Sequence, residues 1–149
     1  MVSRRTVLGA GVSLCLAPPA WSTSRPPLTV YKTASCGCCQ GWIDIMRKAG
    51  YAPKVVVVDN VTPIGAKHGV PFELSSCHLG TIGGYVTVGH VPPKDVERLL
   101  RERPTALGIT VPGMPMGSPG MQMPDGSKEA YQTLLILPGG KTTVFARHG

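Results

Sequence analysis

Three cysteines, Cys36, Cys38 and Cys39, lie within four residues of one another, between two segments with different apolar patterns. The apolar run 28–31 predicts a strand, whereas apolar side chains in 42–49 recur at helical spacing. The thiols are therefore predicted at a strand-to-helix turn, where the helix N-terminus lowers thiol pKa values by favouring the thiolate. Thiolates at such a turn either exchange disulfides or bind a soft metal ion.

The segments that follow have an order typical of a thioredoxin-like domain. Four consecutive valines, 55–58, predict a second strand buried on both faces. A short helix is expected from Pro63, then a hairpin turning at Gly83-Gly84, then a helix with an apolar stripe over 96–103. We therefore predict an α/β fold in which residues 23–149 form one thioredoxin-like domain, a mixed sheet flanked by helices.

This topology makes a spatial prediction about a fourth cysteine. In thioredoxin-like folds the loop before the third strand lies against the thiol turn. Cys77 and His78 belong to that loop and are expected within reach of the three early cysteines. The order of segments does not give the distance of His90 from them, and we expect His68 and His148 on the surface.

The last third of the chain predicts a Met/Pro/Gly-rich loop insertion and a C-terminal strand pair. Residues 104–128 show no apolar periodicity, and four methionines lie among prolines and glycines in 111–124. Long irregular loops in small domains are usually functional or disordered. We interpret this one as folding over the thiols, with filling of core gaps or a recognition surface as the alternatives. Apolar runs at 131–137 and 142–146 then predict the closing strands.

Residues 1–22 have the pattern of an export signal. Arg4 and Arg5 precede an apolar run, 7–17, that is shorter than the roughly 20 residues of a membrane span, and small residues follow. The paired arginines favour a twin-arginine signal, with an ordinary secretory signal as the alternative. We expect Cys15 to be removed with this segment, which leaves a periplasmic domain, 23–149, that does not insert into the membrane.

The charge pattern does not favour a nucleic-acid partner. The formal net charge is +7, but the lysines and arginines are scattered, without a basic run and with few aromatics between them. A solvated basic surface explains them.

Four cysteines in an oxidising compartment suggest two disulfides by default. Cys38 and Cys39 are adjacent, so a bond between them would be strained. The default pairing is therefore Cys36 with Cys39 and Cys38 with Cys77, and this alternative leaves no thiol for a metal.

Several motifs occur together in one order and resemble those of the CopG-type periplasmic copper-handling proteins. They are Cys36-Gly37-Cys38-Cys39, Ser76-Cys77-His78, Gly84-Tyr85, Gly89-His90-Val91-Pro92, Pro112-Gly113-Met114-Pro115 and Gly117-Ser118-Pro119-Gly120-Met121. The resemblance covers residues 28 to about 145. It implies a thioredoxin-like fold, export to the periplasm, copper binding through the cysteines, and chemistry between Cu(I) and Cu(II) in copper resistance. It also implies, as partners, copper ions and other periplasmic copper-resistance proteins.

Two positions depart from the family pattern. Val88 and Gln122 stand where family members often have glutamate. Hydrogen bonding or Cu(II) binding by those carboxylates is therefore not carried over to this chain.

The donor types agree with copper. Cu(I) is soft and prefers thiolate, thioether and imidazole ligands. The predicted metal ligands are Cys36, Cys38, Cys39, Cys77, His78, Met114 and Met121. This is more sulfur than one Cu(I) needs, so a multinuclear cluster is compatible with the sequence. Zinc is the alternative metal, although its structural sites usually use two Cys-x₂-Cys hooks and only one is present.

Three functions remain open, and with them the question whether the protein is an enzyme. In the first, it is a copper and thiol redox protein in which Cys36 and Cys39 are the redox pair. In the second, it is a thiol–disulfide oxidoreductase that uses the same two cysteines without a metal. In the third, it is a copper buffer or metallochaperone without turnover.

Overall fold

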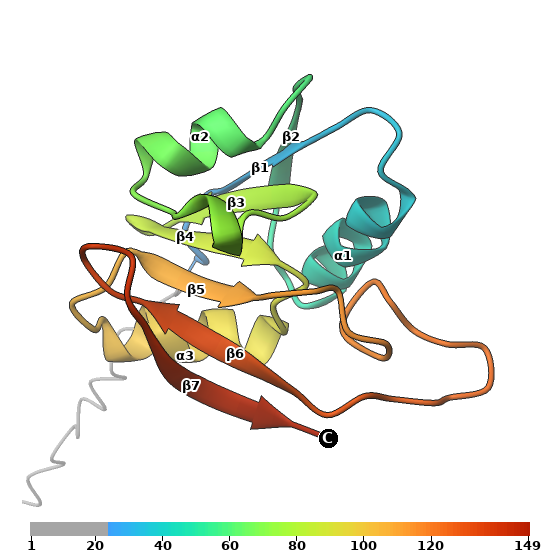
Figure 1. Cartoon of the computed structure of the whole chain (residues 1–149). Coiled ribbons are helices and arrows are strands. Elements are labelled where there is room, and N and C mark those ends of the chain that lie inside the picture. Colours follow the sequence, from blue (N-terminus) through green and yellow to red (C-terminus); the bar gives the residue numbers. More distant parts are fainter. Residues whose placement is uncertain (1–23) are drawn as a thin grey trace, which may run out of the picture.

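The computed structural model describes residues 24–149 (Figure 1). Its elements are β1 (Leu28–Lys32), α1 (Gly37–Lys48), β2 (Pro53–Val57), α2 (Thr62–Lys67), the 3₁₀ turn η1 (Phe72–Leu74), β3 (His78–Ile82), β4 (Tyr85–Gly89), α3 (Pro93–Glu102), β5 (Gly108–Val111), β6 (Tyr131–Ile136) and β7 (Thr142–His148). The predicted export signal, 1–22, lies outside the described residues. Within 24–149 every helix is too short or too polar to cross a membrane.

One mixed sheet of seven strands organises the molecule, in the order β2-β1-β3-β4-β5-β6-β7. The β1–β2 and β4–β5 pairs are parallel and the other pairs are antiparallel. One apolar cluster packs α1 and α3 against the sheet, and a second cluster packs α2 on the other side (Figure 1). The predicted α/β class, with a mixed sheet flanked by helices, is confirmed.

The predicted helix is present as α1, but it begins at Gly37, earlier than the apolar spacing over 42–49 indicates, so Cys38 and Cys39 lie in its first turn. Cys36 is its N-cap, and the Cys36 sulfur accepts the Cys39 N–H at 3.3 Å. Trp42 and Met46 are fully buried, and the Trp42 indole N–H donates to the Val91 carbonyl at 2.8 Å. This bond ties the helix to the segment that follows β4.

The prediction that 55–58 is buried on both faces is wrong. Val55 and Val57 are 36% and 61% exposed, because β2 pairs only with β1 and forms an edge of the sheet. The short strand β5 was not predicted, since it lies in the stretch without periodicity. It nevertheless occupies an inner position in the sheet, and both Ile109 and Val111 are fully buried.

The C-terminal strand pair, β6 and β7, is present and extends the sheet. A buried polar cluster fastens it to α3. The Thr133 hydroxyl donates to the Asp95 carboxylate at 2.6 Å, and His148 Nε2 lies 2.9 Å from the same oxygen. The His148 side chain is only 7% exposed, so its prediction as a surface residue is wrong.

Candidate metal centre

Strand pairing brings the fourth cysteine to the first three. The antiparallel register of β1 and β3 places His78 opposite Lys32, the last residue of β1. Cys77 precedes His78 and therefore lies at the end of the sheet from which the chain enters the cysteine turn. Segments 39 residues apart in the sequence meet here: the sulfurs of Cys38 and Cys77 are 3.9 Å apart.

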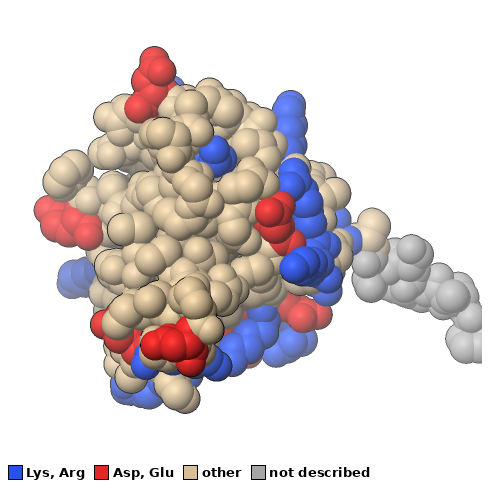
Figure 2. Space-filling model, turned by 90° about the vertical axis from the view of Figure 1, so that its right-hand side faces the viewer, with Lys and Arg blue, Asp and Glu red and all other residues tan. Residues whose placement is uncertain are grey.

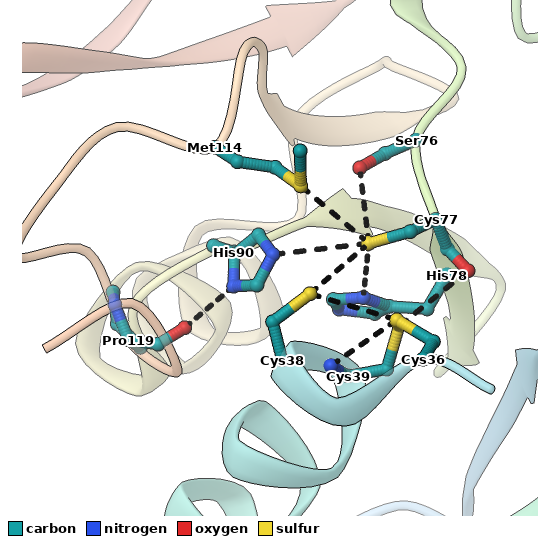
Figure 3. Close-up of a disulfide and its surroundings, with 9 residues drawn as sticks. All are labelled: Cys36, Cys38, Cys39, Ser76, Cys77, His78, His90, Met114 and Pro119. Atoms are coloured by element: carbon teal, nitrogen blue, oxygen red, sulfur yellow. Dashed lines mark hydrogen bonds between the residues drawn. A yellow bond between two sulfur atoms is a disulfide. The ribbon is translucent and has the colours of Figure 1, made fainter.

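The four sulfurs form one compact group (Figure 3). Cys36 and Cys39 are joined by a disulfide, and Cys38 and Cys77 are free thiols. The Cys38 sulfur lies 3.6 Å from that of Cys36, and all four sulfurs lie within 4.8 Å of one another. Two thiolates that bind one ion at about 2.3 Å each are at most about 4.6 Å apart. The free thiols of Cys38 and Cys77 meet that limit.

Two buried histidines complete the group. His78 Nδ1 lies 3.6 Å and His90 Nε2 lies 3.8 Å from the Cys77 sulfur, and both side chains are fully buried. His90 Nδ1 lies 2.8 Å from the Pro119 carbonyl oxygen, which can only accept a hydrogen bond. His90 therefore carries its proton on Nδ1 and directs the lone pair of Nε2 toward Cys77.

The order of the segments does not locate His90, but the glycine turn at 83–84 does. The hairpin of β3 and β4 turns at Gly83-Gly84 and pairs Ile82 with Tyr85. Counting outward along both strands from this pair brings His90 opposite Cys77. A turn at Gly83-Gly84 also fixes which residues of the two strands pair. The sequence therefore contains the information that His90 lies opposite Cys77.

Burial sets the protonation of the group. It is the main cause that lowers the pKa of His78 to about 3, and the neighbouring His90 lowers it further. Burial also lowers the pKa of His90, an effect partly offset by the bond to Pro119. The pKa of Cys77 is raised by burial and by the neighbouring Cys38. At neutral pH both imidazoles are therefore uncharged, and each has a nitrogen lone pair that can bind a metal ion. The Cys77 thiol is protonated, so metal binding there must release a proton.

Of the two predicted methionine ligands, Met114 contacts the cysteine group. The Met114 sulfur is 3.9 Å from the Cys77 sulfur and accepts from its thiol, and the Met114 side chain is 43% exposed. The Met121 sulfur accepts no hydrogen bond from the described thiols. The backbone N–H of Met121 bonds the Ser118 carbonyl, and its carbonyl accepts from Gly117, in a compact turn. Met116 and Met123 are exposed.

A glycine seats this loop over the start of α1. Gly120 has a φ of +91°, and a Cβ at this position would lie 2.8 Å from both the Cys38 carbonyl oxygen and the backbone nitrogen of Trp42. Together with the bond from His90 to Pro119, this close approach places the loop beside the sulfurs. The loop insertion is therefore part of the wall of the site.

The surroundings of the site carry little charge on one side of the molecule. Figure 2 views the side that lies to the right in Figure 1, which includes the start of α1 and the 112–130 loop. Most of its middle is uncharged, and acidic and basic side chains gather toward the margins.

Comparisons with known proteins agree with this architecture. Two solved structures of copper resistance protein CopG, forms 1 and 2, match with TM-scores of 0.77 and 0.78 and sequence identities of 38% and 37%. The matches cover 83% and 84% of this chain and 98% and 99% of the solved chains. The chain belongs to the CopG family. A family model described as "protein of unknown function, DUF411" also matches residues 74–121, and no curated protein matches.

The two departures from the CopG family pattern have structural roles in this chain. Val88 is buried in the apolar cluster that packs α2 against the sheet. The Gln122 side-chain oxygen accepts the N–H of Gly120 at 3.1 Å, which supports the loop where it approaches α1. Neither residue supplies a carboxylate.

Proposed function

We propose that this protein is a periplasmic copper-binding protein that interconverts Cu(I) and Cu(II) at its thiols, in copper resistance or copper handling. Copper is the substrate in this account. The observation that carries the proposal is the convergence of Cys36, Cys38, Cys39 and Cys77, from two remote segments, within 4.8 Å. Support also comes from the family relatives, which are named copper resistance proteins.

The proposed ligands of Cu(I) are the four cysteine thiolates, His78 and Met114, with the addition of His90. These donors are soft or borderline, as Cu(I) requires. Met114 is included because its sulfur contacts that of Cys77, and Met121 is left out because no contact of its sulfur supports it. In the disulfide state two thiols remain, Cys38 and Cys77, whereas reduction supplies four thiols, which is more sulfur than one Cu(I) ion needs.

The proposed redox step uses Cys36 and Cys39. Two Cu(II) ions each take one electron, the two thiols lose two protons, and the Cys36–Cys39 disulfide forms with two Cu(I) as products. The disulfide observed between these residues corresponds to the oxidised side of this reaction. In the reverse direction two Cu(I) ions each give one electron to the disulfide, the two sulfurs take up two protons to become thiols, and the ions leave as Cu(II).

The finer description of the fold and the location belong to the same proposal. We propose that the segment from β1 to α3 is a thioredoxin-like unit. The order β2-β1-β3-β4, with β1 parallel to β2 and antiparallel to β3, supports this. The export pattern of 1–22 supports periplasmic action, where other copper-resistance proteins would be its partners.

A metal-free thiol–disulfide oxidoreductase is the second candidate. It is favoured by one observation, the disulfide between Cys36 and Cys39 at the N-terminus of α1. A helix N-terminus stabilises the attacking thiolate of such enzymes. This account leaves Cys38, Cys77 and the two buried histidines without a role.

An anaerobic titration with Cu(II) separates the two. The protein carries Cys15→Ser, so that an uncleaved signal adds no thiol, and is fully reduced before use. We expect two thiols to disappear and two Cu(I) ions to be trapped by a chromogenic chelator for each molecule oxidised. Zn(II) serves as the redox-inactive control. Oxidation of a dithiol substrate without copper, together with no Cu(I) formed, would favour the oxidoreductase.

A further inference from the structure

The sulfur atoms of the site form a continuous series of close contacts from the Cys36–Cys39 disulfide to Cys77, which precedes β3. Cys39 is bonded to Cys36, the Cys36 sulfur is 3.6 Å from that of Cys38, and the Cys38 sulfur is 3.9 Å from that of Cys77 (Figure 3). Thiol–disulfide exchange needs only a thiolate that can reach a disulfide sulfur. Each thiol on this path lies next to the sulfur that it would attack.

We infer that the disulfide is mobile and transfers from Cys36–Cys39 to Cys38–Cys77 without an external oxidant. First, the Cys38 thiolate attacks the Cys36 sulfur. The Cys36–Cys38 bond forms, the Cys36–Cys39 bond breaks, and Cys39 leaves with the electron pair and takes up the proton that Cys38 released. This inference concerns the thiols alone and holds whether or not copper binds.

In the second step the Cys77 thiolate attacks the Cys38 sulfur. The Cys38–Cys77 bond forms, the Cys36–Cys38 bond breaks, and Cys36 leaves as a thiolate that takes up the proton of Cys77. One disulfide and two thiols are present before and after, so electrons and protons balance within the chain.

Both leaving groups have partners in place. The Cys36 sulfur accepts the Cys39 N–H at 3.3 Å at the helix N-terminus, a position that stabilises a thiolate. The Cys39 sulfur lies 3.5 Å from the Cys77 carbonyl oxygen, which can accept a hydrogen bond from the new Cys39 thiol. Gly37, between Cys36 and Cys38, has open space around it and lets the backbone adapt to the intermediate.

The transfer changes which thiols the site presents. With Cys36–Cys39 oxidised, the free thiols bridge two segments of the fold. With Cys38–Cys77 oxidised, both free thiols lie at the start of α1, and the new bond joins residues 39 apart in place of residues 3 apart. The closed loop is longer, so the new disulfide constrains the unfolded chain more strongly. Disulfide transfer would thus redistribute the soft donors without a change in the oxidation level of the protein.

Tryptic peptides distinguish the two disulfides directly. Cys36, Cys38 and Cys39 fall in peptide 33–47, and Cys77 falls in peptide 68–94, each bounded by lysine or arginine. The Cys15→Ser protein is prepared with one disulfide, incubated anaerobically with a chelator, quenched with acid, alkylated and digested. We expect peptides 33–47 and 68–94 to be found linked, with two alkyl groups on 33–47. Peptide 68–94 alkylated at Cys77 in every molecule would overturn the inference.

Variants test the path and its end state separately. Cys38→Ser should lower the rate of linkage by at least about tenfold. Ser35→Ala, at an exposed position of the same turn, should leave it unchanged. The double variant Cys36→Ser/Cys39→Ser should form the Cys38–Cys77 bond fully, within one molecule, when treated with diamide. Linkage in Cys38→Ser at the original rate, or a double variant that stays reduced, would contradict the proposal. A copper-binding failure would change none of these readouts, so the inference and the proposed function fail separately.

Discussion

The Nδ1 atom of His90 lies 2.8 Å from the carbonyl oxygen of Pro119, and this bond joins the end of β4 to the loop that follows β5. The bond fixes the tautomer of His90 and directs Nε2 toward the Cys77 sulfur, 3.8 Å away. The late loop therefore acts on the cysteine group through a histidine as well as through Met114. A site that looks in the sequence like a cysteine turn depends on four separate segments.

The first prediction concerns His90. His90→Ala removes an imidazole nitrogen beside Cys77, and we expect the affinity for Cu(I) to fall by about 10–100-fold. Competition with a Cu(I) chelator measures this. His68→Ala, at an exposed histidine, is the matched control and should have no effect. Equal affinities of the two variants would remove His90 from the site.

The second prediction concerns Gly120. Gly120→Ala places a Cβ 2.8 Å from two backbone atoms of α1, at a φ of +91° that alanine rarely adopts. Either the loop moves away from α1 or the folded state retains a strained backbone. We expect the free energy of unfolding, from urea titration, to fall by about 1–3 kcal/mol. Gly113→Ala is the control, because its φ is +80° but a Cβ there meets nothing within 4 Å. A loss as large in Gly113→Ala would show that close packing at Gly120 contributes little.

The third prediction is a pH dependence of stability in the reduced, metal-free protein. The His78 imidazole has a pKa near 6.5 in the unfolded chain, whereas burial lowers its pKa to about 3 in the folded protein. The unfolded state binds more protons between these values, so the free energy of unfolding falls as the pH drops from 6.5 toward 3. The slope contributed by His78 is up to about 1.4 kcal/mol per pH unit.

Urea unfolding at pH 7, 6 and 5 measures this slope. His78→Gln should reduce it, and His68→Gln should leave it unchanged because that side chain is exposed. A wild-type protein of equal stability at pH 7 and pH 5 would contradict the burial of a neutral His78.

The fourth prediction concerns the attachment of the C-terminal strands. Thr133→Val keeps the shape of the side chain but removes the hydroxyl that bonds the buried Asp95 carboxylate at 2.6 Å. We expect a loss of about 1–3 kcal/mol in the free energy of unfolding. Thr143→Val, at an exposed position of the neighbouring strand, should cost little. A neutral Thr133→Val would mean that His148 alone satisfies Asp95.

Local patterns predicted much of the fold. Helical spacing over 42–49, the Gly83-Gly84 turn and the closing strands gave α1, the β3–β4 hairpin and β6–β7. The convergence of Cys77 with the early cysteines followed from strand order. These features depend on short-range periodicity and on the few arrangements that a βαβ unit allows.

Features set by position in the sheet could not be predicted in this way. A run of valines looks the same in an edge strand as in a central one, so the exposure of Val55 and Val57 was missed. The strand β5 has only four residues and no period to detect. The path of the methionine loop, which brings the Met114 sulfur to that of Cys77, depends on tertiary contacts at Gly120 and Pro119.

If sulfur atoms from two remote segments form one copper site, then Cys38→Ser and Cys77→Ser must both weaken it. A Cu(I) competition titration of the two variants in the reduced state measures this. We predict that both variants lose affinity by similar factors, each at least about tenfold, while Ser35→Ala binds like the wild type. A Cys77→Ser protein that binds Cu(I) as tightly as the wild type would contradict the account.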